Sequence, residues 1–195
     1  MTDHHDDPHA GDPPLRLAVI IGSTREKRFA PTVAGWFIEQ LRDRDDFELD
    51  LVDLLDAALP DRLMATDDEA VRAFRRRIDR ADAFVIVTPE YNHGYPAALK
   101  QAIDVGYAEW RAKPVGFVSY GGMSGGLRAV EQLRLVFAEL HATTIRDCVS
   151  LHNPWSMADG AALVGAEIAA STMLDQLSWW GAALRHARTT TPYAA

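Results

Sequence analysis

From residue 15 onward, short apolar runs alternate with longer segments of helical periodicity, and this alternation constrains the fold more than any other feature. The run at 15–21 (LRLAVII) is almost continuously apolar, as expected of a parallel strand covered on both faces. Further strands are predicted at 47–53, 83–88, 115–120 and 144–151. Apolar residues at helical spacing predict helices at 31–41, 67–79, 96–106, 123–140 and 160–188. Five strands and five helices therefore alternate along the chain.

Such an alternation predicts an α/β protein, with a parallel sheet between two layers of helices. Five strands favour the order 2-1-3-4-5, which is that of the flavodoxin-like three-layer sandwich. In this order the sheet reverses direction between strands 1 and 3, and ligands occupy the crevice at the carboxyl ends of the strands there. We therefore expect the loops after strands 1, 3 and 4 to converge on one site.

The first fourteen residues differ from the rest of the chain. They contain four aspartates and three prolines, but no lysine, arginine or apolar run. This composition predicts a disordered acidic tail over 1–14, and the segment lacks the pattern of a signal peptide. The remaining length predicts a single domain over 15–188.

Charge and cysteine content exclude several classes of partner. The chain has 20 Lys and Arg against 28 Asp and Glu, a net charge of −8, which argues against nucleic acid as the main ligand. No apolar run approaches the ~20 residues needed to cross a bilayer. Cys148 is the only cysteine, so an internal disulfide and a cysteine-based zinc site are excluded. We expect a cytoplasmic protein that acts on small molecules.

The first loop has the residues of an anion site. Gly22 permits a tight turn, Ser23 and Thr24 supply hydroxyl groups, and the next helix begins shortly afterwards. Arg25 and Arg28 can add charge-assisted hydrogen bonds to a phosphate. Because the P-loop lysine and the GxGxxG glycines are absent, a monophosphate fits better than a nucleoside triphosphate or a dinucleotide. The alternative is an ordinary capped helix start with two arginines on a solvated face.

The second loop offers flat and hydrogen-bonding groups. The backbone amides around Glu90, Tyr91 and Asn92 are suited to the edge of a planar heterocycle, and Pro89 and Tyr91 can pack beside it. Taken alone, the segment is also compatible with an ordinary turn. His93 is a possible proton donor, although a loop histidine is more often a surface group.

The third loop contains Ser119, Tyr120, Gly121 and Gly122. Its two glycines would let the ring of a ligand approach the backbone closely.

Together, GSTRxxR, PEYNHGYPAALKQAID and SYGG resemble the NADPH-dependent FMN reductase family of flavodoxin-like proteins. The resemblance covers roughly 15–150 and is strongest at 89–104. It implies that Ser23, Thr24, Arg25 and Arg28 bind the FMN phosphate, that Pro89, Glu90, Tyr91 and Asn92 bind the isoalloxazine edge, and that Tyr120, Gly121 and Gly122 flank the ring. Arg28 departs from the pattern, since many relatives have a small hydroxyl residue there.

The resemblance also implies an activity. The expected protein transfers electrons from NADPH or NADH through FMN to a small acceptor, such as a quinone, an azo compound, a flavin or a metal oxyanion. The flavin supplies the chemistry, so no acid–base residue is required. Arg111 and Arg128 are candidates for the NADPH 2′-phosphate. Family members are usually dimers, so a homodimer or homotetramer is expected. Trp110 is a candidate interface residue, and ordinary packing in the core explains it equally well.

Two other functions compete with this interpretation. Gly122-Met123-Ser124-Gly125-Gly126 matches the GxSxG motif of serine hydrolases between a predicted strand and a predicted helix. Asp147 with His152, or Asp159 with His186, would complete a triad in the usual chain order. A flavodoxin-type electron carrier would also bind FMN, but two arginines in the phosphate loop favour a reductase.

Overall fold

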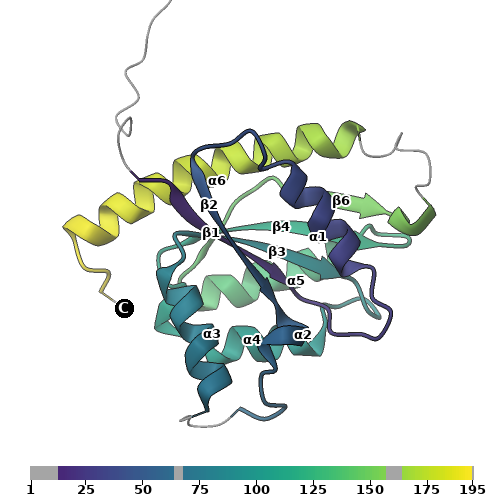
Figure 1. Cartoon of the computed structure of the whole chain (residues 1–195), viewed down its shortest axis with the longest axis horizontal. Helices are drawn as coiled ribbons and strands as arrows, with labels where there is room; N and C mark the ends of the chain where they lie inside the picture. The colour runs from purple at the N-terminus through teal and green to yellow at the C-terminus, as the bar shows by residue number, and fades with distance from the viewer. Residues whose placement is uncertain (1–12, 64–67, 157–163, 195) are drawn as a thin grey trace, which may run out of the picture.

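The computed structural model describes residues 13–63, 68–156 and 164–194 (Figure 1). The strands are β1 Leu15–Ile21, β2 Phe47–Asp53, β3 Ala83–Pro89, β4 Pro114–Gly121, β5 Thr143–Thr144 and β6 Val149–His152. The helices are α1 Ala30–Glu39, α2 Leu54–Ala57, α3 Glu69–Arg80, α4 Ala97–Val105, α5 Leu127–Glu139 and α6 Val164–Thr190, with the 3-10 turns η1 Ala108–Trp110 and η2 Pro154–Ser156. Of the expected acidic tail, residues 1–12 lie outside the described part of the chain.

All the strands run parallel, in the order β2-β1-β3-β4-β5, with β6 also paired to β4. The predicted order 2-1-3-4-5 is thus confirmed, and with it the flavodoxin-like α/β fold. The chain leaves β1 for one edge of the sheet and later returns to β3 on the other side of β1. This reversal opens the site at the carboxyl ends of β1, β3 and β4.

Alternate residues of each central strand enter two separate cores. Leu17 and Val19 of β1 pack under α1 and α6, whereas Ala18 and Ile20 face α3, α4 and α5. Figure 1 shows these two layers of helices on opposite faces of the sheet. β1, β3 and β4 are almost entirely buried, which explains their continuous apolar sequences.

The expected fifth strand over 144–151 is wrong in one respect, because it is divided into β5 and β6. Arg134 of α5 explains the interruption. Its guanidinium donates to the carbonyl oxygens of Ile145 and Arg146, at 2.6 and 2.8 Å. These carbonyls therefore bond to a helix side chain, and pairing with β4 resumes only at Val149.

Two further expectations are corrected. The helix predicted from residue 123 begins at Leu127, because Gly125 and Gly126 have positive φ angles of 60° and 89°. Trp110 is buried in the core rather than at the surface, with its ring centroid 4.6 Å from that of Phe84. Its indole N–H donates to the carbonyl of Ile103, at 3.0 Å.

Among the described residues, the helices are too short or too polar to cross a bilayer.

Candidate functional site

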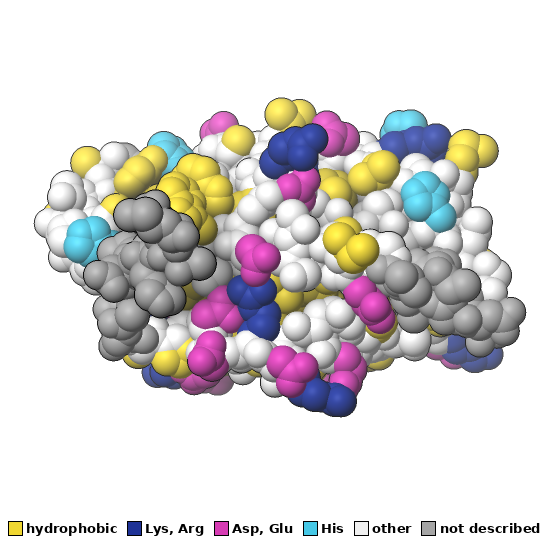
Figure 2. Space-filling model, turned by 90° about the horizontal axis from the view of Figure 1, so that it is seen from above, with side chains coloured by type: hydrophobic (Ala, Val, Ile, Leu, Met, Phe, Trp, Pro, Cys, Tyr) yellow, Lys and Arg dark blue, Asp and Glu magenta, His cyan; other side chains and the backbone are white. Residues whose placement is uncertain are grey.

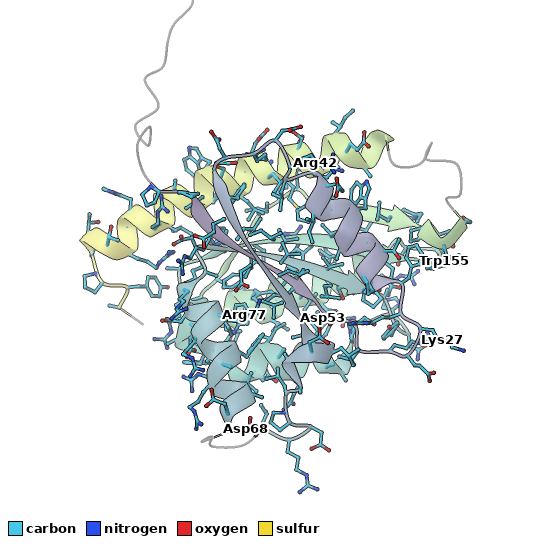
Figure 3. The ribbon with its side chains drawn as sticks, in the orientation of Figure 1. Lys27, Arg42, Asp53, Asp68, Arg77 and Trp155 are labelled. Atoms are coloured by element: carbon cyan, nitrogen blue, oxygen red, sulfur yellow. The ribbon has the colours of Figure 1, made fainter. Side chains whose placement is uncertain are left out.

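The three predicted loops meet around one cavity of about 420 Å³. Its lining comprises residues 25–29 of the first loop, Pro89, Glu90 and Tyr91 of the second, Tyr120, Gly121 and Gly122 of the third, and Trp155 of η2. Figure 3 shows Lys27 and Trp155 at the same end of the molecule, beyond the end of β2 at Asp53. The convergence inferred from the strand order is therefore present in the structure.

Unlike residues 25–29 of the first loop, Ser23 and Thr24 do not line this cavity. Ser23 is fully buried, and its hydroxyl oxygen lies 2.7 Å from that of Tyr91. This hydrogen bond joins the first loop to the second. Thr24 lines a separate, largely apolar cavity of about 420 Å³ between α2, the segment that follows it and α4.

Arg28 makes an ion pair inside the protein. Its guanidinium donates both terminal nitrogens to the Asp53 carboxylate, each at 2.6 Å, and also bonds to the Ser23 carbonyl at 2.6 Å. The Asp53 carboxylate raises the pKa of Arg28 and also caps α2 through the amide of Leu55. Arg28 therefore shapes the first loop, and its expected contact with phosphate stays a prediction.

Arg25 is the more accessible arginine. It is exposed at the cavity, and its guanidinium carbon lies 5.9 Å from the centre of the Tyr91 ring. Among the described residues, no carboxylate pairs with it. Nearby, α1 begins at Ala30 without a side-chain cap, so the positive end of its dipole faces the same loop. This end of the cavity suits an anion.

The second loop is a tight two-residue turn. Tyr91 and Gly94 exchange backbone hydrogen bonds of 2.8 and 3.1 Å. Asn92 and His93 between them have φ angles of 49° and 74°, as in the type I′ turns of hairpins. The Glu90 amide donates to the Tyr120 carbonyl, at 3.1 Å. The expectation that all these amides face a ligand is thus corrected, because those of Glu90 and Tyr91 are used within the chain. Asn92 is exposed and does not line the cavity.

The Glu90 side chain joins the second loop to the third. Its carboxylate accepts a hydrogen bond from the Ser124 hydroxyl and bonds of 3.2 Å from both the backbone amide and the guanidinium of Arg128. The residue before α5 is Gly126, which has no side chain to cap the helix. Glu90 therefore acts as the helix cap from a different loop. No sequence pattern predicts this contact, since it joins residues 38 positions apart.

These contacts also explain the GxSxG motif. A Cβ atom on Gly125 would lie 2.3 Å from the Ser150 hydroxyl, and one on Gly126 would lie 2.7 Å from Cβ of Ser119. Both glycines are therefore needed for close packing at the start of α5. Ser124 bonds to a carboxylate, and no histidine bonds to it in the part of the chain that the structure describes. The hydrolase alternative thus lacks its general base.

The proposed triad partners are also dispersed. His152 lies beside the Ser150 hydroxyl, at 3.5 Å, whereas Asp147 pairs with Arg146 and Gln176. Asp159 lies outside the described residues.

Tyr120 forms a buried wall of the cavity. Its side chain is 4% exposed and packs edge-on against Phe29, with ring centroids 6.3 Å apart. Burial raises the pKa of Tyr120 above the usual range for a phenol. The phenol therefore stays protonated at neutral pH and presents a neutral surface to the cavity.

The two arginines considered for a 2′-phosphate lie in different parts of the molecule. Arg111 precedes β4, at the end of that strand opposite to the cavity, and stacks over Tyr107 at 4.8 Å. Arg111 is therefore too far from the cavity to bind the 2′-phosphate of a cofactor there, and that expectation is wrong. Arg128 lies at the cavity side but is paired with Glu90.

Four lining residues were not predicted from the sequence: Glu26, Lys27, Phe29 and Trp155. The first three belong to the first loop, whereas Trp155 lies outside all three predicted loops. The sequence does indicate that Trp155 follows shortly after the last strand. The end of that strand lies beside the third loop, because the amide of Asn153 donates to the carbonyl of Gly121, at 2.7 Å. This proximity follows from the pairing of β6 with β4, which the sequence alone does not specify.

Comparison with known proteins supports the resemblance. The family model for NADPH-dependent FMN reductases matches residues 15–156. An NAD(P)H-dependent FMN reductase of Schizosaccharomyces pombe is 43% identical over 122 residues, which are 57% of this chain and 60% of that protein. A quinone reductase of Pseudomonas putida is 34% identical over 134 residues, 64% of this chain and 71% of that protein. The chain thus spans less than two thirds of the S. pombe relative.

A solved structure shows the same fold. FerB, a flavoenzyme NAD(P)H:(acceptor) oxidoreductase of Paracoccus denitrificans, superposes with a TM-score of 0.69 at 24% identity, covering 87% of this chain and 98% of FerB. The matched family model extends over all three loops of the cavity and most of the chain. The protein belongs to the NADPH-dependent FMN reductase family.

Proposed function

We propose that this protein is an FMN-dependent oxidoreductase that takes electrons from NAD(P)H and passes them to a small acceptor. The observation that carries the proposal is the single cavity enclosed by all three loops. It lies at the point where strand order reverses, the usual ligand site of this architecture. Its lining combines the basic side chains of Arg25 and Lys27 with the aromatic side chains of Tyr91 and Tyr120, and FMN has a phosphate and a planar ring.

The residues present fit FMN. Arg25 and the uncapped start of α1 supply positive charge for the phosphate. Pro89, Tyr91 and Tyr120 supply apolar and aromatic surface, and Gly121 has no side chain to obstruct a ring. Ser23 joins the first loop to the second through Tyr91, Arg28 bonds within the first loop, and Gly122 lines the cavity from the third loop. Contacts of Thr24 and Asn92 with FMN stay predictions.

Bound FMN supplies the redox chemistry, accepting a hydride equivalent and releasing electrons to the acceptor. The chain itself would orient the ring, exclude water on the side of Tyr120 and pair Glu90 with Arg128. We propose a quinone as the acceptor class, on the basis of the P. putida relative. A flat, neutral quinone also suits the uncharged part of the cavity.

We further propose that residues 15–188 act as one FMN-binding domain in a cytoplasmic homodimer. Leu55 is more than half exposed and lines the apolar cavity that includes Thr24, and this exposed apolar area suits a subunit contact. Sedimentation velocity is the test of assembly: a single species of about 21.6 kDa would exclude the dimer.

The function is tested by titration calorimetry with FMN and FAD, followed by NAD(P)H oxidation in the presence of a benzoquinone. We expect one FMN per chain, weaker FAD binding, and oxidation that depends on both FMN and quinone. Absence of FMN binding would end the flavoenzyme proposal.

A further inference from the structure

Trp155 is an exposed aromatic residue at the cavity, outside every motif that led to the site. Its side chain is 57% exposed, yet it lines the same cavity as Arg25, Tyr91 and Tyr120. Exposed tryptophans are common at binding surfaces because a large apolar ring gains stability when a ligand covers it. Exposure alone does not mark a site, since Trp179 on α6 is 65% exposed and lines none of the cavities described above.

The backbone that carries Trp155 is held firmly against the third loop. Asn153 donates its amide to the carbonyl of Gly121, at 2.7 Å, and adopts a φ angle of 46°. Its own carbonyl accepts bonds from the amide and the hydroxyl of Ser156, at 2.9 and 2.7 Å. Pro154 between them is buried. The indole is therefore presented on a short, fixed turn whose position follows the end of β4.

The chemistry of the indole matches one part of FMN. Indole is an electron-rich ring and has no charge to offer a phosphate, whereas the isoalloxazine is planar and electron-poor. Stacking between such rings adds stabilisation beyond the apolar area that it buries. The same cavity is also lined by the aromatic side chain of Tyr91.

We propose that Trp155 is a ring-positioning residue that forms an aromatic wall against the isoalloxazine of FMN. This inference rests on the proposed function, since it takes FMN as the ligand. It separates two tasks within the cavity: Arg25 recognises the phosphate, and Trp155 recognises the ring. Riboflavin has the ring without the phosphate, so it distinguishes the two.

The test is a titration of FMN and of riboflavin against the wild type and four variants. We expect Trp155→Ala and Trp155→Leu to weaken both ligands by the same factor, roughly 10-fold. Trp155→Phe keeps an aromatic ring and should stay within about threefold of the wild type. Trp179→Ala is the matched control, an exposed tryptophan on α6, and should leave both affinities unchanged.

A second readout does not depend on affinity. Stacked indole quenches flavin emission, so FMN bound to Trp155→Ala or Trp155→Leu should fluoresce more strongly than FMN bound to the wild type. Unchanged affinities and unchanged emission in both variants would overturn the proposal, as would a loss confined to FMN. Failure of the wild type to bind FMN would instead refute the proposed function.

Discussion

We expect recognition of the phosphate to depend on Arg25, because Arg28 is already paired with Asp53. We expect Arg25→Ala to weaken FMN binding by about 10- to 150-fold, corresponding to roughly 1.5–3 kcal/mol for a charge-assisted hydrogen bond. Riboflavin lacks the phosphate, so its affinity should hardly change. Calorimetry with both ligands measures the difference, with Arg42→Ala, an exposed arginine beyond the end of α1, as control. Equal losses for the two ligands would remove Arg25 from the phosphate site.

Ser124 decides between the two enzyme classes. Its hydroxyl bonds to Glu90, so Ser124→Ala should loosen the start of α5 and cost about 0.5–2 kcal/mol of stability, as loss of a cap does. NAD(P)H oxidation should remain within about tenfold, since no covalent step uses the hydroxyl. Serine-directed phosphonates test the alternative: stoichiometric labelling of the wild type that disappears in the variant would favour a hydrolase.

Lys113 is a buried amine, 5% exposed, that donates to the carbonyls of Ile78 and Asp79 at the end of α3. Burial lowers the pKa of Lys113 to about 8. Below pH 8 the amine is charged in both the folded and unfolded states, and the cost of burying that charge is fully present. Between pH 8 and about 10.5 only the unfolded state keeps the proton, so the free energy of unfolding rises with pH.

The Lys113→Met variant isolates this effect, because it cannot titrate at that position. The difference in unfolding free energy, wild type minus variant, should increase between pH 8 and 10.5 by up to about 3 kcal/mol. Urea denaturation across this range measures it. A difference that stays constant with pH would show that the amine titrates alike in both states.

At the scale of the elements, the turn before α5 depends on glycine. A Cβ atom on Gly126 would lie 2.8 Å from the Tyr120 amide nitrogen, at a φ angle of 89°. We expect Gly126→Ala to cost more than about 2 kcal/mol, through both strain and overlap. Gly35→Ala on α1 is the contrasting variant, because a Cβ there meets nothing within 4 Å. It should stabilise the helix by about 0.5–1 kcal/mol, and chemical denaturation compares the two.

Periodicity predicted the sheet order and the position of the site, because buried parallel strands have distinctive apolar runs. It failed where a single side chain overrides the local pattern. Arg134 interrupts the fifth strand by binding two of its carbonyls, and nothing near Ile145 in sequence indicates that. The same holds for Glu90 as a cap and for Trp155 as a lining residue, since both depend on contacts between segments far apart in the chain. The assigned contacts to FMN stay predictions.

At the scale of the molecule, α6 holds the two ends of the described chain together. Arg185 donates to the carbonyl of Pro13, at 2.8 Å, and Arg188 pairs with Asp82 at 3.0 Å. Met173 and Leu177 approach β4 closely at Gly116, where a Cβ would lie 3.1 Å from each of them. α6 thus covers the sheet on the side away from α3, α4 and α5.

On the face drawn in Figure 2, acidic and basic side chains lie next to one another among apolar ones, with no continuous basic patch among the described residues.

The Arg28–Asp53 pair joins the first loop to the end of an edge strand, so we expect ligand binding at this loop to affect that strand. Asp53 ends β2, an edge strand, and fluctuations that open a strand end are among the least costly in a folded protein. Each opening would release Arg28 and distort the first loop, so a ligand bound there suppresses the opening. At a free FMN concentration of 100 times its Kd, amide hydrogen exchange at the end of β2 should slow by up to about 100-fold. If exchange slows only at residues 22–29, the end of β2 opens independently of cofactor binding.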